Sequence, residues 1–159
     1  MRLGPMTWPM AIGKAGAIAA SKKREGDGKT PLGRYRLECL YYRPDRLVLP
    51  NVPLAHHAIS ARLGWCDDPS AKAYNQLVHK PFSASHEDLV RQDQLYDGLI
   101  VLSHNRWPAV PGYGSAIFLH IAKHDKGELT PTQGCLALRR SDFLAMLALL
   151  TPHMEISIV

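Results

Sequence analysis

A cysteine that follows a glycine is the most chemically suggestive feature of this sequence. Cys135 comes directly after Gly134, and His120 lies upstream within the apolar stretch Ile117 to Ala122. A nucleophilic cysteine needs a partner that takes its proton and donors that stabilise an oxyanion. His120 can be that partner, and the glycine allows successive backbone N–H groups to approach one oxygen atom. A cysteine, a histidine and a glycine of this kind are the residues needed for acyl transfer through a thioester.

A less specific interpretation of the same residues stays open. Cysteines are often buried and inert, and a histidine on an apolar strand is often a core residue bonded to backbone. Spacing alone does not decide between a catalytic pair and a structural pair. Cys39 and Cys66 fit packing roles better than catalysis. Because the three cysteines match no zinc motif, at least one thiol is free unless the chain dimerises through it.

Two motifs together resemble a known family. The first is His120 with the later segment Thr132-Gln133-Gly134-Cys135-Leu136-Ala137. It resembles the signature of the L,D-transpeptidase catalytic domain (YkuD-like) family. In that family a strand histidine is followed by Ser/Thr-His-Gly-Cys, an apolar residue and usually Arg or Asn. Gln133 replaces the second histidine of the signature, and Ala137 replaces its basic or amide residue.

The second motif lies near the other end of the chain. Residues 21–33 read SKKREGDGKTPLG and resemble the family's EGDGKTPxG segment, which leads into a strand bordering the active site. Because the two motifs are far apart in the sequence, the resemblance spans most of the chain.

The resemblance implies a cysteine-dependent L,D-transpeptidase that cross-links peptidoglycan stem peptides. Cys135 would attack the carbonyl that follows the L-centre of a diaminopimelate residue, and His120 would act first as base and then as acid. The N–H groups of Gly134 and Cys135 would stabilise the oxyanion. The resemblance implies no metal or organic cofactor, and it implies a location in the cell envelope or periplasm. Which stem residue donates the acyl group stays open.

Two other functions fit the same residues. An L,D-carboxypeptidase or amidase would use the Cys135 and His120 pair, with water in place of the acceptor amine. A catalytically silent cell-wall-binding module would keep the fold and the basic surface, but its Cys135 would be inert. Product analysis would separate these alternatives.

Substrate contacts are expected from polar residues in loops and beside the cysteine. Loop residues that packing does not require can offer hydrogen bonds to a peptide in a groove. Turn formation and loop capping explain the loop residues about as well. The predicted substrate-binding residues are Tyr74, Asn75, His104, Asn105, Thr132 and Gln133.

Two further motifs are weak. Gly28-Lys29-Thr30 ends like a phosphate-binding loop, but Lys23 stands where the first glycine of that loop would be needed. His120 and His124 have the spacing of a zinc-binding helix, yet glutamate is absent after His120 and the surrounding residues favour a strand. Neither a nucleotide site nor a metal site is predicted.

Composition sets wider bounds. The chain has 159 residues and a formal net charge of +5, which favours anionic partners without choosing among them. The basic residues are scattered and lack an aromatic RNA-binding signature, so nucleic acid is not a predicted partner. No apolar run approaches the length of a membrane span, and prolines interrupt the first twenty residues, so no signal peptide is predicted. Oligomeric state is left open.

The elements that must position the cysteine and histidine are mostly strands. Glycines and prolines divide the chain into short apolar or alternating segments. One helix is expected at Asp142–Leu150, capped by Ser141, and a weaker one at Glu87–Leu95. We therefore expect residues 1–159 to form a single mainly β domain, sandwich-like or barrel-like, with one or two short covering helices. Strands are expected at Thr7–Ile12, Ala15–Ala20, Gly33–Tyr42, Leu54–Ile59, Gly98–Leu102, Ser115–Ala122, Gly134–Leu138 and Glu155–Val159.

Overall fold

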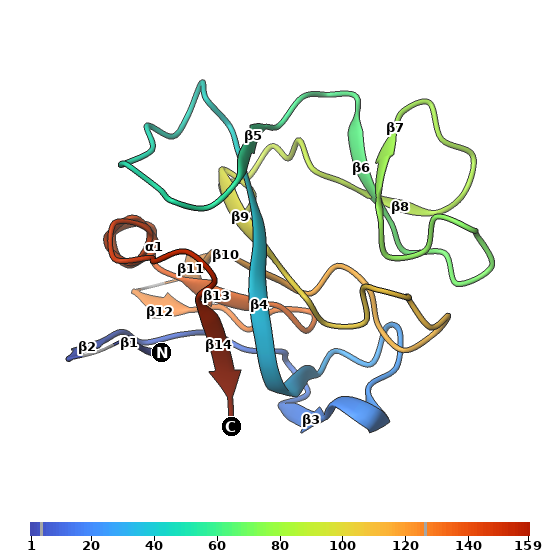
Figure 1. The fold of residues 1–159 in the computed structure, drawn as a ribbon, viewed down its shortest axis with the longest axis horizontal. Helices are drawn as coiled ribbons and strands as arrows, with labels where there is room; N and C mark the ends of the chain where they lie inside the picture. The colour runs from blue at the N-terminus through green and yellow to red at the C-terminus, as the bar shows by residue number, and fades with distance from the viewer. Residues whose placement is uncertain (4, 126) are drawn as a thin grey trace.

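A curled sheet forms the centre of the protein (Figure 1). The computed structural model describes residues 1–3, 5–125 and 127–159, and within them this sheet has seven strands. Their path is β13-β10-β9-β4-β14, and β3 and β5 also pair with β4. These strands are β3 (Ala17–Ala19), β4 (Thr30–Tyr42), β5 (His56–Ala58), β9 (Gly98–Leu102), β10 (Phe118–Ile121), β13 (Leu136–Leu138) and β14 (Glu155–Ile158).

The middle of the sheet is buried on both faces. Every residue of β9, β10 and β13 is buried, as expected for continuous apolar runs covered from two sides. The strand predicted at Gly98–Leu102 is confirmed with its bounds, and the other predicted segments of this sheet are confirmed with shorter or shifted ends. His120 is the one polar residue of β10, so its imidazole enters the protein interior.

One α-helix, α1 (Arg140–Leu147), is present among the described residues. Its buried Phe143, Met146 and Leu147 pack in the main core, as the apolar spacing predicts. The predicted Ser141 cap is wrong, because the helix starts earlier, from an N-cap at Arg139 that makes no side-chain capping bond. Arg140 donates a 2.8 Å hydrogen bond to Asp97, which ties the first turn to the residue before β9.

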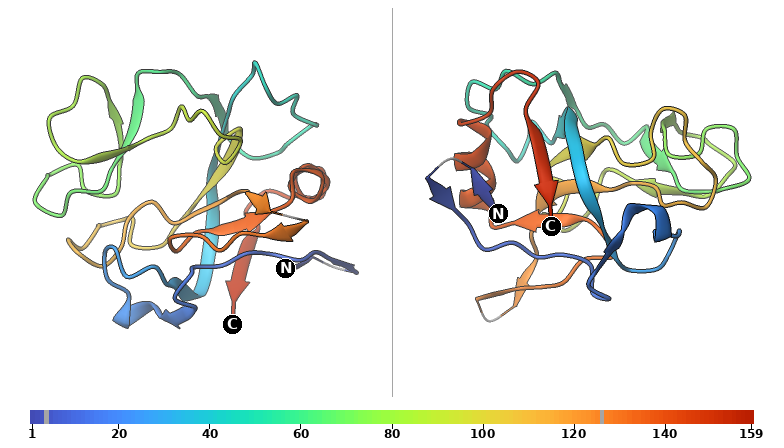
Figure 2. Two further views of the ribbon diagram at one scale, coloured as in Figure 1. Left: turned by 180° about the vertical axis from the view of Figure 1, so that it is seen from behind. Right: turned by 60° about the horizontal axis from the view of Figure 1, so that its bottom comes forward.

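The second predicted helix, Glu87–Leu95, is wrong. Its first residues belong to β8 (His86–Asp88), which pairs with β6 (Leu63–Cys66), and β6 also pairs with β7 (Leu77–His79). This three-stranded sheet forms a lobe beside the main sheet, at the opposite end from α1 in Figures 1 and 2. Pairing with β6 satisfies the backbone groups that a helix would otherwise satisfy internally.

The N-terminal segment runs along the edge of β13 (Figure 2). The predicted strand Thr7–Ile12 is only partly formed, since Ala11 makes an isolated bridge to Ala137 and Gly13 makes one to Thr132. The remaining elements are short. They are β1 (Arg2–Leu3), β2 (Met6–Thr7), the 3-10 helix η1 (Ala20–Lys22), β11 (His124–Asp125) and β12 (Glu128–Leu129).

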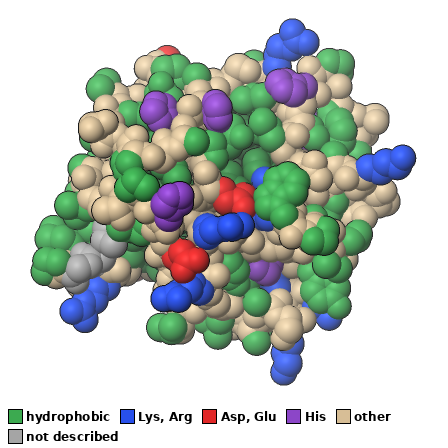
Figure 3. Space-filling model, in the orientation of Figure 1, with side chains coloured by type: hydrophobic (Ala, Val, Ile, Leu, Met, Phe, Trp, Pro, Cys, Tyr) green, Lys and Arg blue, Asp and Glu red, His purple; other side chains and the backbone are tan. Residues whose placement is uncertain are grey.

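The fold is mainly β, with sheets that curl into a half-barrel or sandwich, as predicted. One core cluster fills the space between the main sheet and α1, and a second lies between β9, β10 and the lobe. On the face drawn in Figure 3, the basic side chains are interspersed with acidic and apolar ones. The net positive charge is therefore not gathered into a single stripe on that face.

Candidate active site

Thr30 connects the two sequence motifs. Its hydroxyl accepts a 2.8 Å hydrogen bond from the Gly13 N–H and donates one of 2.9 Å to the Gly134 carbonyl. Thr30 is fully buried, so losing either bond would leave a polar group unpaired away from water. The segment after Gly28 therefore holds the backbone of the cysteine loop in place.

Gly134 occupies a backbone conformation that other residues rarely adopt. Its φ is +140°, and a Cβ atom there would lie 2.9 Å from the carbonyl oxygen of Lys29. Its N–H donates to Thr132 Oγ1 at 3.1 Å, and the same hydroxyl donates to the Cys135 carbonyl at 2.6 Å. Glycine is thus needed both for the backbone angle and for the close approach of the two motifs.

Cys135 directly precedes β13, the strand that pairs with β10. The two strands are parallel, with His120 paired to Ala137, so the cysteine and the histidine come from neighbouring strands. The Cys135 thiol donates to the Ala116 carbonyl at 3.2 Å, and the Phe118 N–H donates to the sulfur at 3.4 Å. Backbone groups at the start of β10 therefore fix the position of the sulfur.

The imidazole of His120 is oriented by backbone. Its Nδ1 lies 2.8 Å from the Ile121 carbonyl oxygen, and its ring packs edge-on against Tyr96 with centroids 5.4 Å apart. A carbonyl oxygen only accepts hydrogen bonds, so Nδ1 carries the proton and Nε2 keeps a free lone pair. A backbone carbonyl and an aromatic ring therefore orient His120.

Both members of the pair are uncharged at neutral pH. Burial lowers the pKa of His120 to about 4, an effect that the Ile121 carbonyl only partly opposes. Burial, with a smaller contribution from the carboxylate of Glu87, also raises the pKa of Cys135 to about 12. The resting pair is therefore a thiol and a neutral imidazole rather than a thiolate and an imidazolium.

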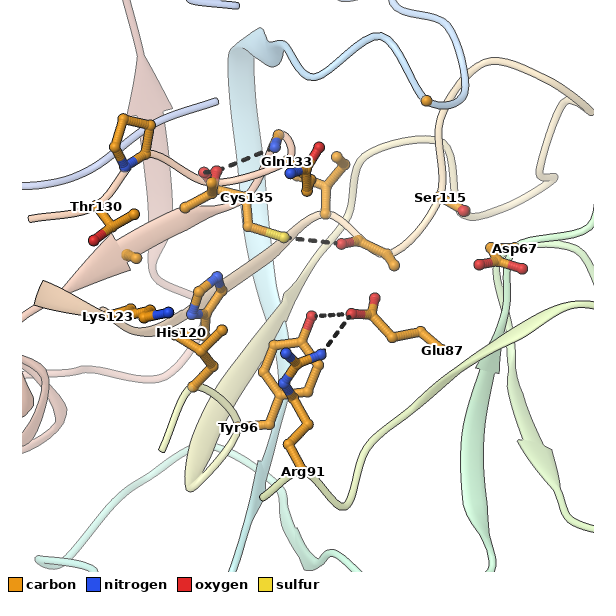
Figure 4. Close-up of a pocket in the computed structure, with 18 of the residues that line it drawn as sticks. Asp67, Glu87, Arg91, Tyr96, Ser115, His120, Lys123, Thr130, Gln133 and Cys135 are labelled. Carbon is orange, nitrogen blue, oxygen red and sulfur yellow. Dashed lines mark hydrogen bonds and ion pairs between the residues drawn. The ribbon is translucent and has the colours of Figure 1, made fainter. Parts of the chain in front are cut away.

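A cavity of about 520 Å³ opens beside the sulfur. Its volume is in the range of small-molecule and peptide sites. Figure 4 shows Cys135 and His120 on one side of this cavity, with Glu87, Arg91 and Tyr96 below the sulfur and Asp67 across from it. The other residues of interest on its lining are Lys23, Glu25, Ser115, Lys123, Thr130, Thr132, Gln133, Gly134 and Ala137.

The comparison with protein families agrees with this geometry. The family model described as YkuD, L,D-transpeptidase catalytic domain, matches residues 4–158, which is nearly the whole chain. The chain belongs to this family. It matches none of the curated proteins and none of the solved structures with which it was compared.

In this L,D-transpeptidase domain, five of the predicted site residues lie together. The predicted catalytic residues Cys135, His120 and Gly134 line the cavity, as do Thr132 and Gln133. Thr132 uses its hydroxyl within the loop, whereas Gln133 is exposed. Gln133 is therefore the member of this group whose side chain is most available to a ligand.

Four predicted substrate-binding residues lie elsewhere, in a buried network behind the cavity lining. The Asn75 side chain accepts from Trp65 and Ala116 and donates to the carbonyls of His104 and Asn105. Nε2 of His104 lies 3.0 Å from the Tyr113 carbonyl oxygen, and the Asn105 amide bonds to Val110 and Gly114.

Tyr74 donates a 2.5 Å hydrogen bond to Glu25, which does line the cavity. All four residues are thus engaged with other protein groups, which is the loop-forming role that polar loop residues commonly have. They support the wall of the L,D-transpeptidase cavity from behind.

Sequence reasoning did not identify the charged side of the cavity. The Tyr96 hydroxyl donates a 2.6 Å hydrogen bond to Glu87, and Arg91 approaches the same carboxylate at 3.8 Å. Burial raises the pKa of Glu87, although the Tyr96 hydrogen bond opposes this. Asp67, Glu87, Arg91 and Tyr96 are called the charged wall below. The lobe and the segment that leads into β9 bring them to the cysteine, and no local pattern predicts that.

Ala137, which departs from the family signature, lies beside His120. It is fully buried and pairs with His120 across the strands, while its backbone bonds to Ala11 on the other side. Because Ala137 also lines the cavity, the space beside the imidazole is bounded by a methyl group rather than by a basic or amide side chain.

The described part of the chain has neither a metal-binding cluster nor a membrane-spanning helix. No group of three or more His, Cys, Asp or Glu side chains there could hold a metal ion, and the side chain of His124 lies outside the described residues. In the same part of the chain, no helix has the length and apolar character needed to cross a bilayer.

Proposed function

We propose that this protein is a peptidoglycan L,D-transpeptidase in which Cys135 is the nucleophile and His120 is the base. The observation that carries the proposal is the placement of both residues on adjacent parallel strands at one cavity, with Nε2 of the imidazole free. Membership of the L,D-transpeptidase catalytic domain family supports the substrate class.

The first step is attack on the stem peptide. As the Cys135 sulfur bonds to the carbonyl carbon that follows the L-centre of diaminopimelate, its proton passes to Nε2 of His120. Because the resting pair is neutral, proton transfer accompanies attack rather than preceding it. The imidazolium then protonates the leaving amine, the C–N bond breaks, and a thioester remains on Cys135.

The oxyanion of the tetrahedral intermediate needs nearby donors. We assign this role first to the Cys135 N–H. The Gly134 N–H donates to Thr132 in the resting structure, so it would have to exchange that bond for the oxyanion. Only the Gly134 N–H would need to change its partner, because Thr30 holds the Gly134 carbonyl and so keeps the loop in place.

The second step decides between transfer and hydrolysis. When the amine of another stem attacks the thioester, it loses a proton to His120 and the C–S bond breaks. The imidazolium returns the proton to the Cys135 sulfur, and a cross-link has formed. If water attacks instead, the same site acts as an L,D-carboxypeptidase. A substrate of this kind places the protein at the cell envelope, and this location is part of the proposal.

The decisive experiment is incubation with purified stem tetrapeptides, followed by intact-protein and product mass spectrometry. We expect an acyl adduct on Cys135 and cross-linked dimers, both absent in Cys135→Ala. Cys39→Ala is the matched control, because Cys39 is a partly buried thiol of β4 outside the cavity lining. Hydrolysed tripeptide without dimers would favour the carboxypeptidase. Unchanged products in Cys135→Ala would refute the nucleophile, and binding without any product would favour a silent wall-binding module.

A further inference from the structure

Two oxygen atoms on the cavity lining are buried and lack a hydrogen-bond partner. By hydrogen-bond geometry they are Oδ1 of Asp67 and Oγ of Ser115, the only such side-chain atoms among the described residues. The Ser115 hydroxyl does lie near enough to the Tyr74 hydroxyl to lower the pKa of that group against the larger effect of burial, which raises it. Ser115 is 6% exposed and lies directly before Ala116, whose carbonyl accepts from the Cys135 thiol. Buried polar groups are normally paired, so an unpaired hydroxyl and carboxylate at one cavity point to a ligand.

Carboxylates surround these two oxygen atoms. Glu25, Asp67 and Glu87 all line the cavity, and the charges of Asp67 and Glu25 add to the burial that raises the pKa of Glu87. Both contacts to Glu87, from Tyr96 and Arg91, go to Oε1. Figure 4 shows the second oxygen of Glu87 directed into the cavity, and Ser115 and Asp67 on the side away from His120.

The cations on the lining neutralise this acidic end only in part, since Arg91 approaches Glu87 at 3.8 Å but makes its shorter contacts to another carboxylate. Lys23 donates to Asp27 at 2.5 Å, and Arg91 makes two 2.8 Å hydrogen bonds to Asp93, so each is matched by a carboxylate that is not on the lining. Lys123 lies near His120, at the opposite side of the cavity (Figure 4). The lining is therefore acidic away from the histidine and basic beside it.

We propose that Asp67, Glu87 and Ser115 form a subsite for a primary ammonium group on the side chain of the acyl donor. An ammonium has three donors and no acceptor, which matches two carboxylates and a hydroxyl that come from different elements. The inference rests on the proposed function, because the donor diaminopimelate carries an ammonium group, next to a carboxylate, at the far end of its side chain. Since Ser115 neighbours the residue that contacts the sulfur, this side chain can reach the subsite while its carbonyl meets Cys135.

The test compares two N-terminally blocked tetrapeptides that differ only in the residue before the scissile bond, lysine or norleucine. Binding is measured by calorimetry to Cys135→Ala, which cannot react. We expect the lysine peptide to bind about tenfold more tightly, as one or two hydrogen bonds to a charged group would give. Adding Asp67→Asn or Ser115→Ala should remove most of this preference. Equal affinity of Cys135→Ala for the two peptides would overturn the subsite.

Controls separate folding from recognition. Asp45→Asn removes an exposed carboxylate that pairs with Arg43 and is not on the lining, so it should leave the preference unchanged. Thermal unfolding of each variant checks that the fold is kept. If Asp67→Asn proves unfolded, Ser115→Ala is used in its place. The double variant Ser115→Ala with Glu87→Gln then gives the decisive result. If that variant is folded and still prefers the lysine peptide, the inference is overturned.

Failure of this inference can be told apart from failure of the proposed function. A lysine preference in binding with no adduct on Cys135 of the unmodified protein would keep the subsite and reject the transpeptidase. Adduct formation with equal binding of both peptides would reject the subsite and keep the transpeptidase. If Asp67→Asn changes only the partition of the thioester between amine and water, the ammonium belongs to the acceptor, and the assignment to the donor is overturned.

Discussion

The two sides of the cavity are built in different ways. The wall that carries the proposed catalytic residues, called the catalytic wall here and made of His120, Thr132, Gly134 and Cys135, consists of adjacent strands and a loop held by hydrogen bonds to backbone groups. The charged wall comes from the lobe and from the segment that leads into β9, and its Glu87, Arg91 and Tyr96 contact one another. The catalytic wall thus fixes the reacting atoms, while the charged wall sets the electric field that acts on them.

The difference explains why both reacting groups are neutral. Burial in the catalytic wall disfavours the charged forms of thiol and imidazole alike, and Glu87 across the cavity adds a negative charge that further disfavours a thiolate. Activation therefore depends on the base that receives the proton during attack. The largest effects should come from changes to the catalytic wall, and the smallest from changes to the charged wall.

Replacement of His120 should have the largest effect. His120→Asn keeps a polar side chain but removes the base, so single-turnover acylation should fall by about 10²- to 10⁴-fold. Rapid-quench mass spectrometry of the adduct measures this rate. His57→Asn, at an exposed position of β5, is the matched control and should acylate at the unmodified rate. Acylation of His120→Asn within threefold of the unmodified rate would show that another group takes the proton.

The raised pKa of Cys135 predicts slow alkylation. With a pKa of about 12, the thiolate fraction at pH 8 is smaller than that of an ordinary cysteine, so iodoacetamide should react about 10³-fold more slowly than with a thiol peptide. The rate should rise about tenfold per pH unit from pH 7 to 10, because thiolate forms as pH approaches the pKa. Peptide mapping distinguishes Cys135 from the other two cysteines. A plateau of the rate below pH 8 would instead indicate a preformed thiolate and imidazolium.

The catalytic wall could be predicted from the sequence because its signals are local. Gly134 and Cys135 are adjacent, and His120 is conspicuous as a polar residue in an apolar strand. The charged wall could not be predicted, since Glu87 belongs to a strand that pairs with distant β6 and was expected in a helix. Asn75 shows the opposite error, because a polar loop residue can serve the backbone as readily as a ligand.

Gly134→Ala tests how tightly the catalytic wall is fixed. The added methyl group would lie 2.9 Å from the Lys29 carbonyl oxygen, at a φ that alanine rarely adopts, so the free energy of unfolding should fall by about 1–3 kcal/mol. Acylation should fall as well, because the loop must move. Gly112→Ala is the control for backbone strain alone, since its φ is +80° and no atom lies within 4 Å of the added Cβ. Equal stability losses in the two variants would mean that the contact with Lys29 is not tight.

The smallest effect is expected from Tyr96→Phe, which changes the charged wall and spares the ring that packs against His120. Loss of the hydrogen bond to Glu87 should lower the free energy of unfolding by about 0.5–1.5 kcal/mol. It should also raise the pKa of Glu87 further, because the hydroxyl now stabilises its charged form. Chemical denaturation measures the first quantity, and carboxyl NMR titration measures the second. Tyr113→Phe, a half-exposed position, is the control and should change neither.

Acylation by Tyr96→Phe should stay within about threefold of the unmodified rate, because the imidazole keeps both its ring contact and its bond to the Ile121 carbonyl. A loss as large as that of His120→Asn would mean that the Tyr96 hydroxyl itself takes part in proton transfer. Tyr96 would then belong to both the catalytic wall and the charged wall, and the two walls would not have separate roles.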